Sequence, residues 1–158
     1  ARFCTAKYST KTRKNRYRHL TNYSLNKQNP DFIKNSGSER DDEGHKWSLR
    51  AVWGWMREHN VDPEPVQRRI DDLIVKTILA VETQVHTLVQ LHVPHRSNCF
   101  QLLGFDVMLD AQLQPWLMEV NTSLSLATDS PLDKELKNCV VTHLLHLLQI
   151  QAYDRKNL

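Results

Sequence analysis

The sequence has no apolar run long enough to cross a membrane as a helix, which would need about 20 mostly apolar residues. Its first residues also lack the apolar segment of a secretory signal peptide. It holds three cysteines, an odd number, and they are widely spaced: Cys4, Cys99 and Cys139. These absences argue against a membrane protein or a disulfide-stabilised secreted one. We therefore expect reduced thiols, a cytoplasmic location and no membrane partner.

Acidic residues are absent from the first eighteen positions, where seven basic side chains fall: Arg2, Lys7, Lys11, Arg13, Lys14, Arg16 and Arg18. Such a run attracts polyanions through long-range steering. The candidate polyanions are nucleotide phosphates, nucleic acid or an acidic protein tail, and a solvated basic loop is the alternative. The aromatic spacing here does not match a nucleic-acid-binding module, so we expect no nucleic acid partner.

The length of 158 residues and the apolar and charged fractions are typical of one globular domain. We place this domain at residues 1–150, with residues 151–158 as a tail and residues 28–46 as a flexible polar loop. The chain starts at Ala1, inside a segment with the alternation of a strand, Arg2–Tyr8. We therefore expect it to be a fragment of a longer protein.

The segment Cys99–Ser125 contains two apolar runs, Cys99–Leu109 and Leu113–Val120. Turn-forming residues separate the runs, which predicts an antiparallel hairpin. Three oxygen-bearing side chains interrupt the apolar pattern of this segment: Asp106, Glu119 and Asn121.

If Ala111 and Gln112 form a two-residue loop, Asp106 lies opposite Leu117, with Glu119 as its diagonal neighbour on the same face. Asn121 follows Glu119 at period two and shares that face. Diagonal neighbours roughly 7–8 Å apart can hold a divalent cation between them, and oxygen ligands favour Mg²⁺. A turn of odd length would place Asp106 on the opposite face. A surface hairpin with its polar face in water accounts for the spacing equally well.

Three segments have the apolar spacing of helices, and together with the hairpin they predict an α+β fold with an antiparallel sheet packed against helices. The first helix is capped by Ser48 or a neighbour, and the last by Ser130 or Asp129. The first predicted helix is Trp47–His59, with an apolar stripe at Trp47, Val52, Trp55 and Met56. The second is Pro63–His92, with a stripe at Val66, Ile70, Leu73, Ile74, Thr77, Ile78, Val81, Val85, Leu88 and Val89. The third is Pro131–Ile150, with a stripe at Leu136, Val140, Leu144, Leu147 and Leu148. The short segment His19–Asn26 is β-prone.

Some isolated polar residues fit incidental structural positions better than functional ones. Lys76 lies among the apolar residues of its helix, which indicates a snorkelling or salt-bridged side chain. Pro94 between His92 and His95 argues against a zinc pair. Cys139, His143 and His146 have metal-binding spacing but no fourth ligand, so an amphipathic helix with incidental histidines is the better interpretation.

The motifs GFDVMLD and PWLMEVNTSLSL resemble the C-terminal half of the ATP-grasp domain in the tubulin–tyrosine ligase-like family. HLTNYS, at His19–Ser24, matches the other hallmark of that family, in the same order along the chain. HRSNCFQLLGFDV and SPLD look most similar to the glutamate-adding, or polyglutamylase, branch. The resemblance covers nearly the whole chain, from Arg2 to about Ile150.

This resemblance implies an enzyme that uses ATP and Mg²⁺ to ligate free glutamate to glutamate side chains in the acidic tails of tubulin. The acceptor carboxylate would attack the γ-phosphate, and the incoming amine would then displace phosphate. Arg2, Asp106 and Glu119 would act in catalysis. The motifs assign Mg²⁺ to Asp106, Glu119 and Asn121, and nucleotide contacts to Arg2, His19, Thr21 and Asn22. Microtubules would be the partner, in the cytoplasm and cytoskeleton, with the cilium or basal body as a further site.

Two departures from the family pattern bear on activity. The upstream half of an ATP-grasp site, which carries lysines and the adenine-binding segment, does not match this sequence, so we expect the chain alone to bind nucleotide weakly or not at all. Leu124 also replaces a proline that would stiffen the turn after the metal ligands. Leu124→Pro in an intact enzyme should leave activity equal or higher, and a clear loss would mean that the turn has its own geometry.

Two other functions fit parts of the sequence. A non-catalytic tubulin-binding module could keep the fold and use the basic segment Lys7–Arg18 as its surface. Another ATP-grasp ligase could act on a small molecule or a non-tubulin protein, although HLTNYS together with the hairpin argues against this.

Overall fold

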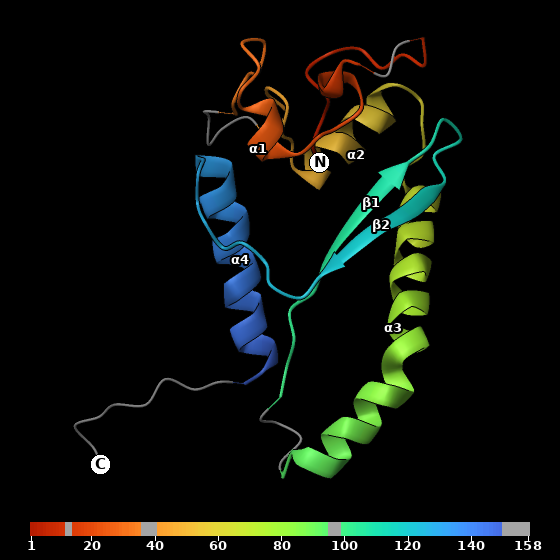
Figure 1. Cartoon of the computed structure of the whole chain (residues 1–158), viewed down its shortest axis with the longest axis vertical. Coiled ribbons are helices and arrows are strands. Elements are labelled where there is room, and N and C mark those ends of the chain that lie inside the picture. Colours follow the sequence, from red (N-terminus) through yellow and green to blue (C-terminus); the bar gives the residue numbers. More distant parts are fainter. Residues whose placement is uncertain (12–13, 36–40, 95–98, 150–158) are drawn as a thin grey trace, which may run out of the picture. The chain divides into compact units, whose positions relative to one another are not determined.

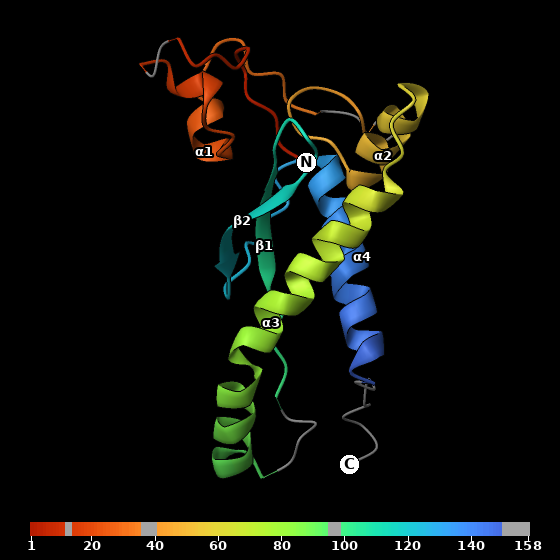
Figure 2. The same cartoon turned by 90° about the vertical axis from the view of Figure 1, so that its right-hand side faces the viewer.

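The computed structural model describes residues 1–11, 14–35, 41–94 and 99–149, and these residues form an α+β fold (Figures 1 and 2). The chain divides into two compact units, Ala1–His59 with Ala127–Leu158, and Asn60–Leu126. No helix in the described ranges is long and apolar enough to span a membrane. The predictions for Arg13, residues 36–40, His95 and the tail 151–158 lie outside the described residues.

In the first unit the predicted strand Arg2–Tyr8 is wrong beyond its first residues. Arg2 forms a single antiparallel bridge with Lys46, flanked by hydrogen bonds from Phe3 N to His45 O (2.9 Å) and from Trp47 N to Ala1 O (3.0 Å). The chain then leaves this pairing, because Thr5 Oγ1 donates to the amide oxygen of Asn26 (3.0 Å). These side-chain contacts replace a continued ladder.

The segment predicted to be β-prone, His19–Asn26, forms no strand, and its last four residues form the short α-helix α1 (Tyr23–Asn26) instead. The 3-10 helix η1 (Arg16–Arg18) comes just before this segment. Asn15 caps η1 by accepting a hydrogen bond from Tyr17 N (3.1 Å). Short polar side chains that bond to nearby backbone favour such turns over extended structure, and this outweighs the β-propensity of the segment.

Helices α2 (Leu49–Glu58) and α4 (Pro131–Leu147) begin where capping residues were expected. Ser48 Oγ accepts from Ala51 N (2.9 Å) and Ser130 Oγ accepts from Asp133 N (3.1 Å), which confirms both serine caps. The predicted apolar stripes are only partly buried. Met56 and Leu132 are buried, but the stripe positions Trp55, Leu136, Val140 and Leu147 are exposed, because no described residue covers them.

The second unit consists of α3 (Glu64–His92) and a hairpin of β1 (Gly104–Leu109) and β2 (Pro115–Asn121). Helix α3 packs against β2, as expected for a sheet with a helix on one face. The predicted stripe holds only in the first half of the helix, where Val66 is buried and the other stripe positions up to Thr77 are half-buried. Ile78, Val81, Val85 and Leu88 are exposed.

Candidate functional site

The hairpin register places Asp106 directly opposite Glu119, and Gly104 opposite Asn121. The predicted register, with Asp106 opposite Leu117, is wrong, because residues 110–114 separate the strands instead of a two-residue loop. A turn of this odd length would put Asp106 and Glu119 on opposite faces. A bulge between Asp106 and Val107 adds one unpaired residue on β2 and restores a common face.

Asp106, Glu119 and Asn121 therefore project from one face of the hairpin, as predicted, although by a different route. Asp106 and Glu119 are exposed and Asn121 is half-buried. The Asn121 amide Nδ2 donates to Glu119 Oε1 (3.1 Å), so the two side chains at the end of β2 already touch. Two carboxylates and an amide oxygen form a donor set that fits a hard divalent cation such as Mg²⁺.

Asp110 builds the turn that joins the two strands. Its carboxylate accepts hydrogen bonds from Gln112 N, Gln114 N and Trp116 Nε1, each 2.9 Å long. The bond from Trp116 is the main cause that holds the pKa of Asp110 below its usual range, and the backbone bond from Gln114 adds to it. Leu113 in this turn has a positive φ of 58°. The acid at position 110 therefore shapes the turn.

Two contacts hold the segment that follows Asn121. Leu124 lies against Gly104, where its side chain fills the space that a β-carbon would occupy. Gln101 Nε2 donates to the Thr122 carbonyl (2.7 Å). The turn that lacks the family proline is thus tied to β1 and its preceding residues. The expectation for Leu124→Pro did not include this packing, and it stays a prediction.

In the first unit the structure brings together two of the four predicted nucleotide contacts. Arg2 and Thr21 line one small hollow, together with Phe3, Tyr23, Phe32, His45 and Lys46. His19 and Asn22 do not line it. His19 is half-buried with its ring edge-on to Tyr8 (5.4 Å), and Asn22 is exposed and makes no side-chain cap to α1.

Asn26 is a buried residue beside the HLTNYS motif whose structural role the sequence analysis missed. Its side chain is 1% exposed. The amide donates to Leu20 O (2.8 Å) and to Asn22 O (3.0 Å), while its oxygen accepts from Thr5. Asn26 therefore fixes the backbone of the HLTNYS motif. A polar residue in a short helix gives no sign of such burial, so only the contacts reveal it.

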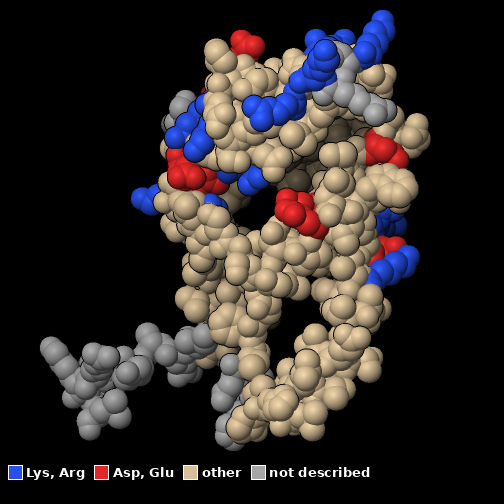
Figure 3. Space-filling view, viewed as in Figure 1, with Lys and Arg blue, Asp and Glu red and all other residues tan. Residues whose placement is uncertain are grey.

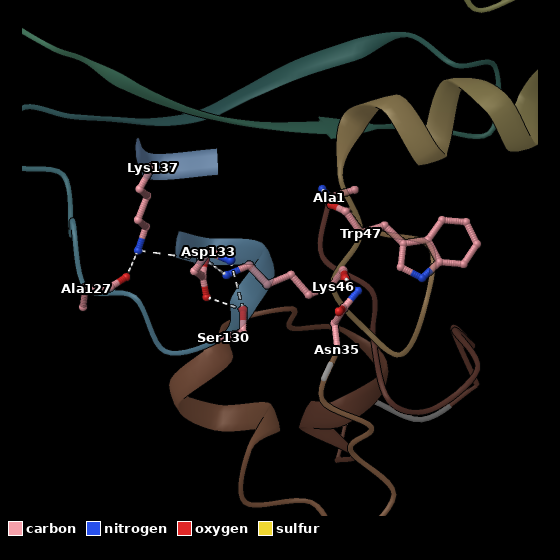
Figure 4. Close-up of polar contacts among 8 residues, drawn as sticks. All are labelled: Ala1, Asn35, Lys46, Trp47, Ala127, Ser130, Asp133 and Lys137. Carbon is pink, nitrogen blue, oxygen red and sulfur yellow. Dashed lines mark hydrogen bonds and ion pairs between the residues drawn. The ribbon is translucent and has the colours of Figure 1, made fainter. Parts of the chain in front are cut away.

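Lys46 and Asp133 form an ion pair between segments 87 positions apart in the sequence (Figure 4). Asp133 is buried at the first turn of α4, where Ser130 Oγ donates to it (2.9 Å) and Lys137 lies 3.9 Å away. Burial acts to raise the pKa of the Asp133 carboxyl. The hydrogen bonds from Lys46 and Ser130 and the charges of Lys46 and Lys137 outweigh burial, so the pKa lies below its usual range.

The sequence also singles out Lys76, Cys139 with His143, and the basic segment Lys7–Arg18. Lys76 pairs with Asp72 (2.6 Å), which confirms the salt-bridged interpretation. Cys139 Sγ lies 3.7 Å from His143 Nδ1 on α4, and no group of three or more His, Cys, Asp or Glu side chains among the described residues could hold a metal ion. Lys7, Lys11 and Arg16 of the basic segment are exposed, and Figure 3 shows Lys and Arg side chains gathered at the top of that view.

Comparison with known proteins places these motifs in one family. The profile of the Tubulin-tyrosine ligase family matches residues 1–157. The chain is 40% identical to the tubulin polyglutamylase TTLL5 of Homo sapiens over 98% of its length. It is 41% identical over 92% of its length to the tubulin monoglutamylase TTLL4 of Mus musculus, and 42% identical over 90% to the tubulin polyglutamylase ttll-5 of Caenorhabditis elegans.

The chain spans only a small part of these relatives. The matched region is 12% of the human protein, 12% of the mouse protein and 20% of the nematode protein.

Proposed function

The chain belongs to the tubulin-tyrosine ligase family, and from this membership we propose that it is the C-terminal half of an ATP-grasp domain in an ATP-dependent protein–glutamate ligase. The observation that carries the proposal is the pairing of Asp106 with Glu119, with Asn121 on the same face of the hairpin. These are the residues that the family motifs assign to the metal, and the bulge in β2 brings them together.

Asp106, Glu119 and Asn121 would hold Mg²⁺ in this proposal. Their two carboxylates and one neutral oxygen would leave other positions on the ion for phosphate oxygens. When bound, Mg²⁺ would neutralise charge between the terminal phosphates of ATP and the acceptor carboxylate. The hydrogen bond from Asn121 Nδ2 to Glu119 Oε1 orients both side chains without a bound ion.

Arg2 and Thr21 would contact the nucleotide phosphates. The guanidinium of Arg2 presents several donors in a fixed fork that suits oxyanions, and the Thr21 hydroxyl can donate one further hydrogen bond. Arg2 would stabilise charge that develops on the transferred phosphoryl group. His19 and Asn22 stay proposed nucleotide contacts of the same motif.

The substrates follow from the relatives. The human, mouse and nematode proteins are named for the glutamylation of tubulin. We therefore infer that free glutamate is the incoming amino acid, that a glutamate side chain in a tubulin tail is the acceptor, and that the protein works on microtubules of the cytoskeleton, in the cytoplasm or the cilium.

The test is mass spectrometry of tubulin tails after incubation with Mg-ATP and, in separate reactions, glutamate, glycine or tyrosine. The full-length native protein and the 158-residue chain are assayed in parallel. We expect adducts of glutamate only, from the full-length protein, and their loss in Glu119→Gln. Glu82→Gln is the matched control, because Glu82 is exposed on α3 and lies outside the proposed site.

Mn²⁺ binding, followed by electron paramagnetic resonance, tests the metal site without relying on turnover. Asp106→Asn and Glu119→Gln should each weaken binding at least tenfold, whereas Asp71→Asn and Glu82→Gln should not change it. Unaltered Mn²⁺ binding in both site variants would contradict the metal assignment. If tubulin is retained but no amino acid is added, the chain is instead a tubulin-binding module that uses the basic segment Lys7–Arg18.

A further inference from the structure

Arg2 and Lys46 face each other across the antiparallel bridge of the first unit. The flanking hydrogen bonds join Phe3 to His45 and Trp47 to Ala1, so Arg2 and Lys46 form the narrow, non-hydrogen-bonded kind of pair. Residues directly opposite in such a pair project from the same face, with β-carbons about 4.5–5.5 Å apart. The cationic side chains of Arg2 and Lys46 therefore project side by side from the same face of this bridge.

Like charges in this position repel each other and weaken the pairing. The structure supplies a counter-charge to only one of them. Asp133, which is buried, pairs with Lys46. Arg2 is exposed and makes no ion pair with any described residue. A negative ligand beside Arg2 would complete the charge balance of this edge.

The hollow beside the pair is suited to an oxyanion. Arg2, Lys46 and Thr21 line it, and no carboxylate does. Aromatic rings form the rest of its wall, with Tyr23 edge-on to Phe32 (5.9 Å) and Phe32 stacked on His45 (5.5 Å). Apolar walls exclude water and strengthen electrostatic attraction inside such a site.

We propose that Arg2, Lys46 and Thr21 form an oxyanion-binding site in which Lys46, oriented by Asp133, is the second cation. The lysine ammonium has three donors, of which one goes to Asp133 and others can meet a ligand. The ligand is an oxyanion of a substrate, either a nucleotide phosphate or an amino-acid carboxylate. This inference rests on the proposed function for Arg2, and it adds Lys46 and Asp133 as a ligand-binding residue and its positioning partner.

Isothermal titration of the full-length native protein tests this site with three probes: inorganic pyrophosphate, glutamate and Mg-ATPγS. Lys46→Met should weaken binding of at least one probe tenfold or more, and Lys46→Arg should stay within threefold of the wild type. Lys134→Met is the matched control, because Lys134 is exposed on α4 and does not line this hollow.

Lys46→Met leaves the Asp133 carboxylate unpaired and buried, which can unfold the protein. The double variant Lys46→Met/Asp133→Asn removes both charges and must show the same loss of binding, with folding checked by circular dichroism.

The outcomes distinguish a phosphate from a carboxylate as the ligand. They also distinguish failure of the oxyanion site from failure of the proposed ligase function. If the Lys46 variants bind pyrophosphate and Mg-ATPγS more weakly but glutamate unchanged, Lys46 binds a phosphate. If they bind only glutamate more weakly, Lys46 binds a carboxylate. Binding of every probe within threefold of wild type in both the single and the double variant overturns the inference. If the wild-type protein binds pyrophosphate but does not bind Mg-ATPγS, the oxyanion site is supported and the proposed function is contradicted. Wild-type binding of neither pyrophosphate nor glutamate overturns the site.

Discussion

The side chain of Leu124 fills the space that Gly104 leaves by having no β-carbon. Gly104 lies opposite Asn121, two residues before Asp106, so this contact borders the proposed metal site. A branched side chain in place of the family proline therefore packs the end of the hairpin from the face that carries the acids.

Gly104→Ala should displace Leu124, because the new methyl group and the Leu124 side chain cannot share one position. Overpacking of this kind costs about 1–3 kcal/mol, and we expect the lower end because the leucine side chain can move. The double variant Gly104→Ala/Leu124→Ala should recover stability and Mn²⁺ affinity relative to Gly104→Ala alone. Urea unfolding and Mn²⁺ titration of the four proteins measure this coupling. Strict additivity of the two substitutions would show that the contact is absent.

Asn26→Ala should loosen the HLTNYS motif. The substitution removes three hydrogen bonds, those to Leu20 O and Asn22 O and the one from the Thr5 hydroxyl, at a cost of about 1–3 kcal/mol. It should also weaken Mg-ATPγS binding by the full-length protein, because Thr21 lies within the loosened segment. Asn138→Ala, at an exposed position of α4, is the control and should change stability by less than about 0.5 kcal/mol. Equal unfolding midpoints for the two variants would contradict the role of Asn26.

The Lys46–Asp133 pair should make stability depend on acidity. The pKa of Asp133 is lower in the folded state than its unfolded value near 3.9, so the unfolded chain binds the proton more readily in acid. Its contribution is therefore complete at neutral pH and declines as the pH falls below about 4 through the folded pKa. Urea unfolding at several pH values should show a steeper acid loss for wild type than for Asp133→Asn. Glu135→Gln, an exposed neighbour on α4, should keep the wild-type slope, and parallel curves for wild type and Asp133→Asn would contradict the prediction.

The three cysteines should react with iodoacetamide in a fixed order. All three are free thiols. Burial raises the pKa of the Cys4 thiol, and a smaller thiolate fraction slows alkylation. Cys99 and Cys139 are exposed, so peptide mass spectrometry at neutral pH should find them modified before Cys4. Faster labelling of Cys4 would place it in an open environment, contrary to the structure.

Local patterns predicted the elements whose stability comes from their own residues. Ser48 and Ser130 mark helix starts, and the predicted caps are present at both positions. The apolar runs around Asp106 and Glu119 predicted a hairpin, which is present, but the two acids share a face because of a bulge and not through the predicted register. The strand prediction for Arg2–Tyr8 failed, because Asn26 and Asn29 bind Thr5 from more than twenty residues away.

The hairpin register shows where local reasoning stops. Nothing in the spacing of Asp106 and Glu119 predicts a bulge, because a bulge is a property of how the two strands pair. The apolar spacing of α3 and α4 likewise predicted buried stripes, but burial depends on what lies opposite. Many of those side chains are exposed among the described residues.

The sequence by itself determined the helices, their serine caps, the acidic hairpin and the family motifs, because these depend on residues close together in the chain. Only the tertiary structure decided that Asp106 lies opposite Glu119, that Asn26 fixes the HLTNYS backbone and that Lys46 pairs with Asp133 beside Arg2. Those relationships join positions up to 87 residues apart. Folding sets them through packing and charge balance, which no local pattern records.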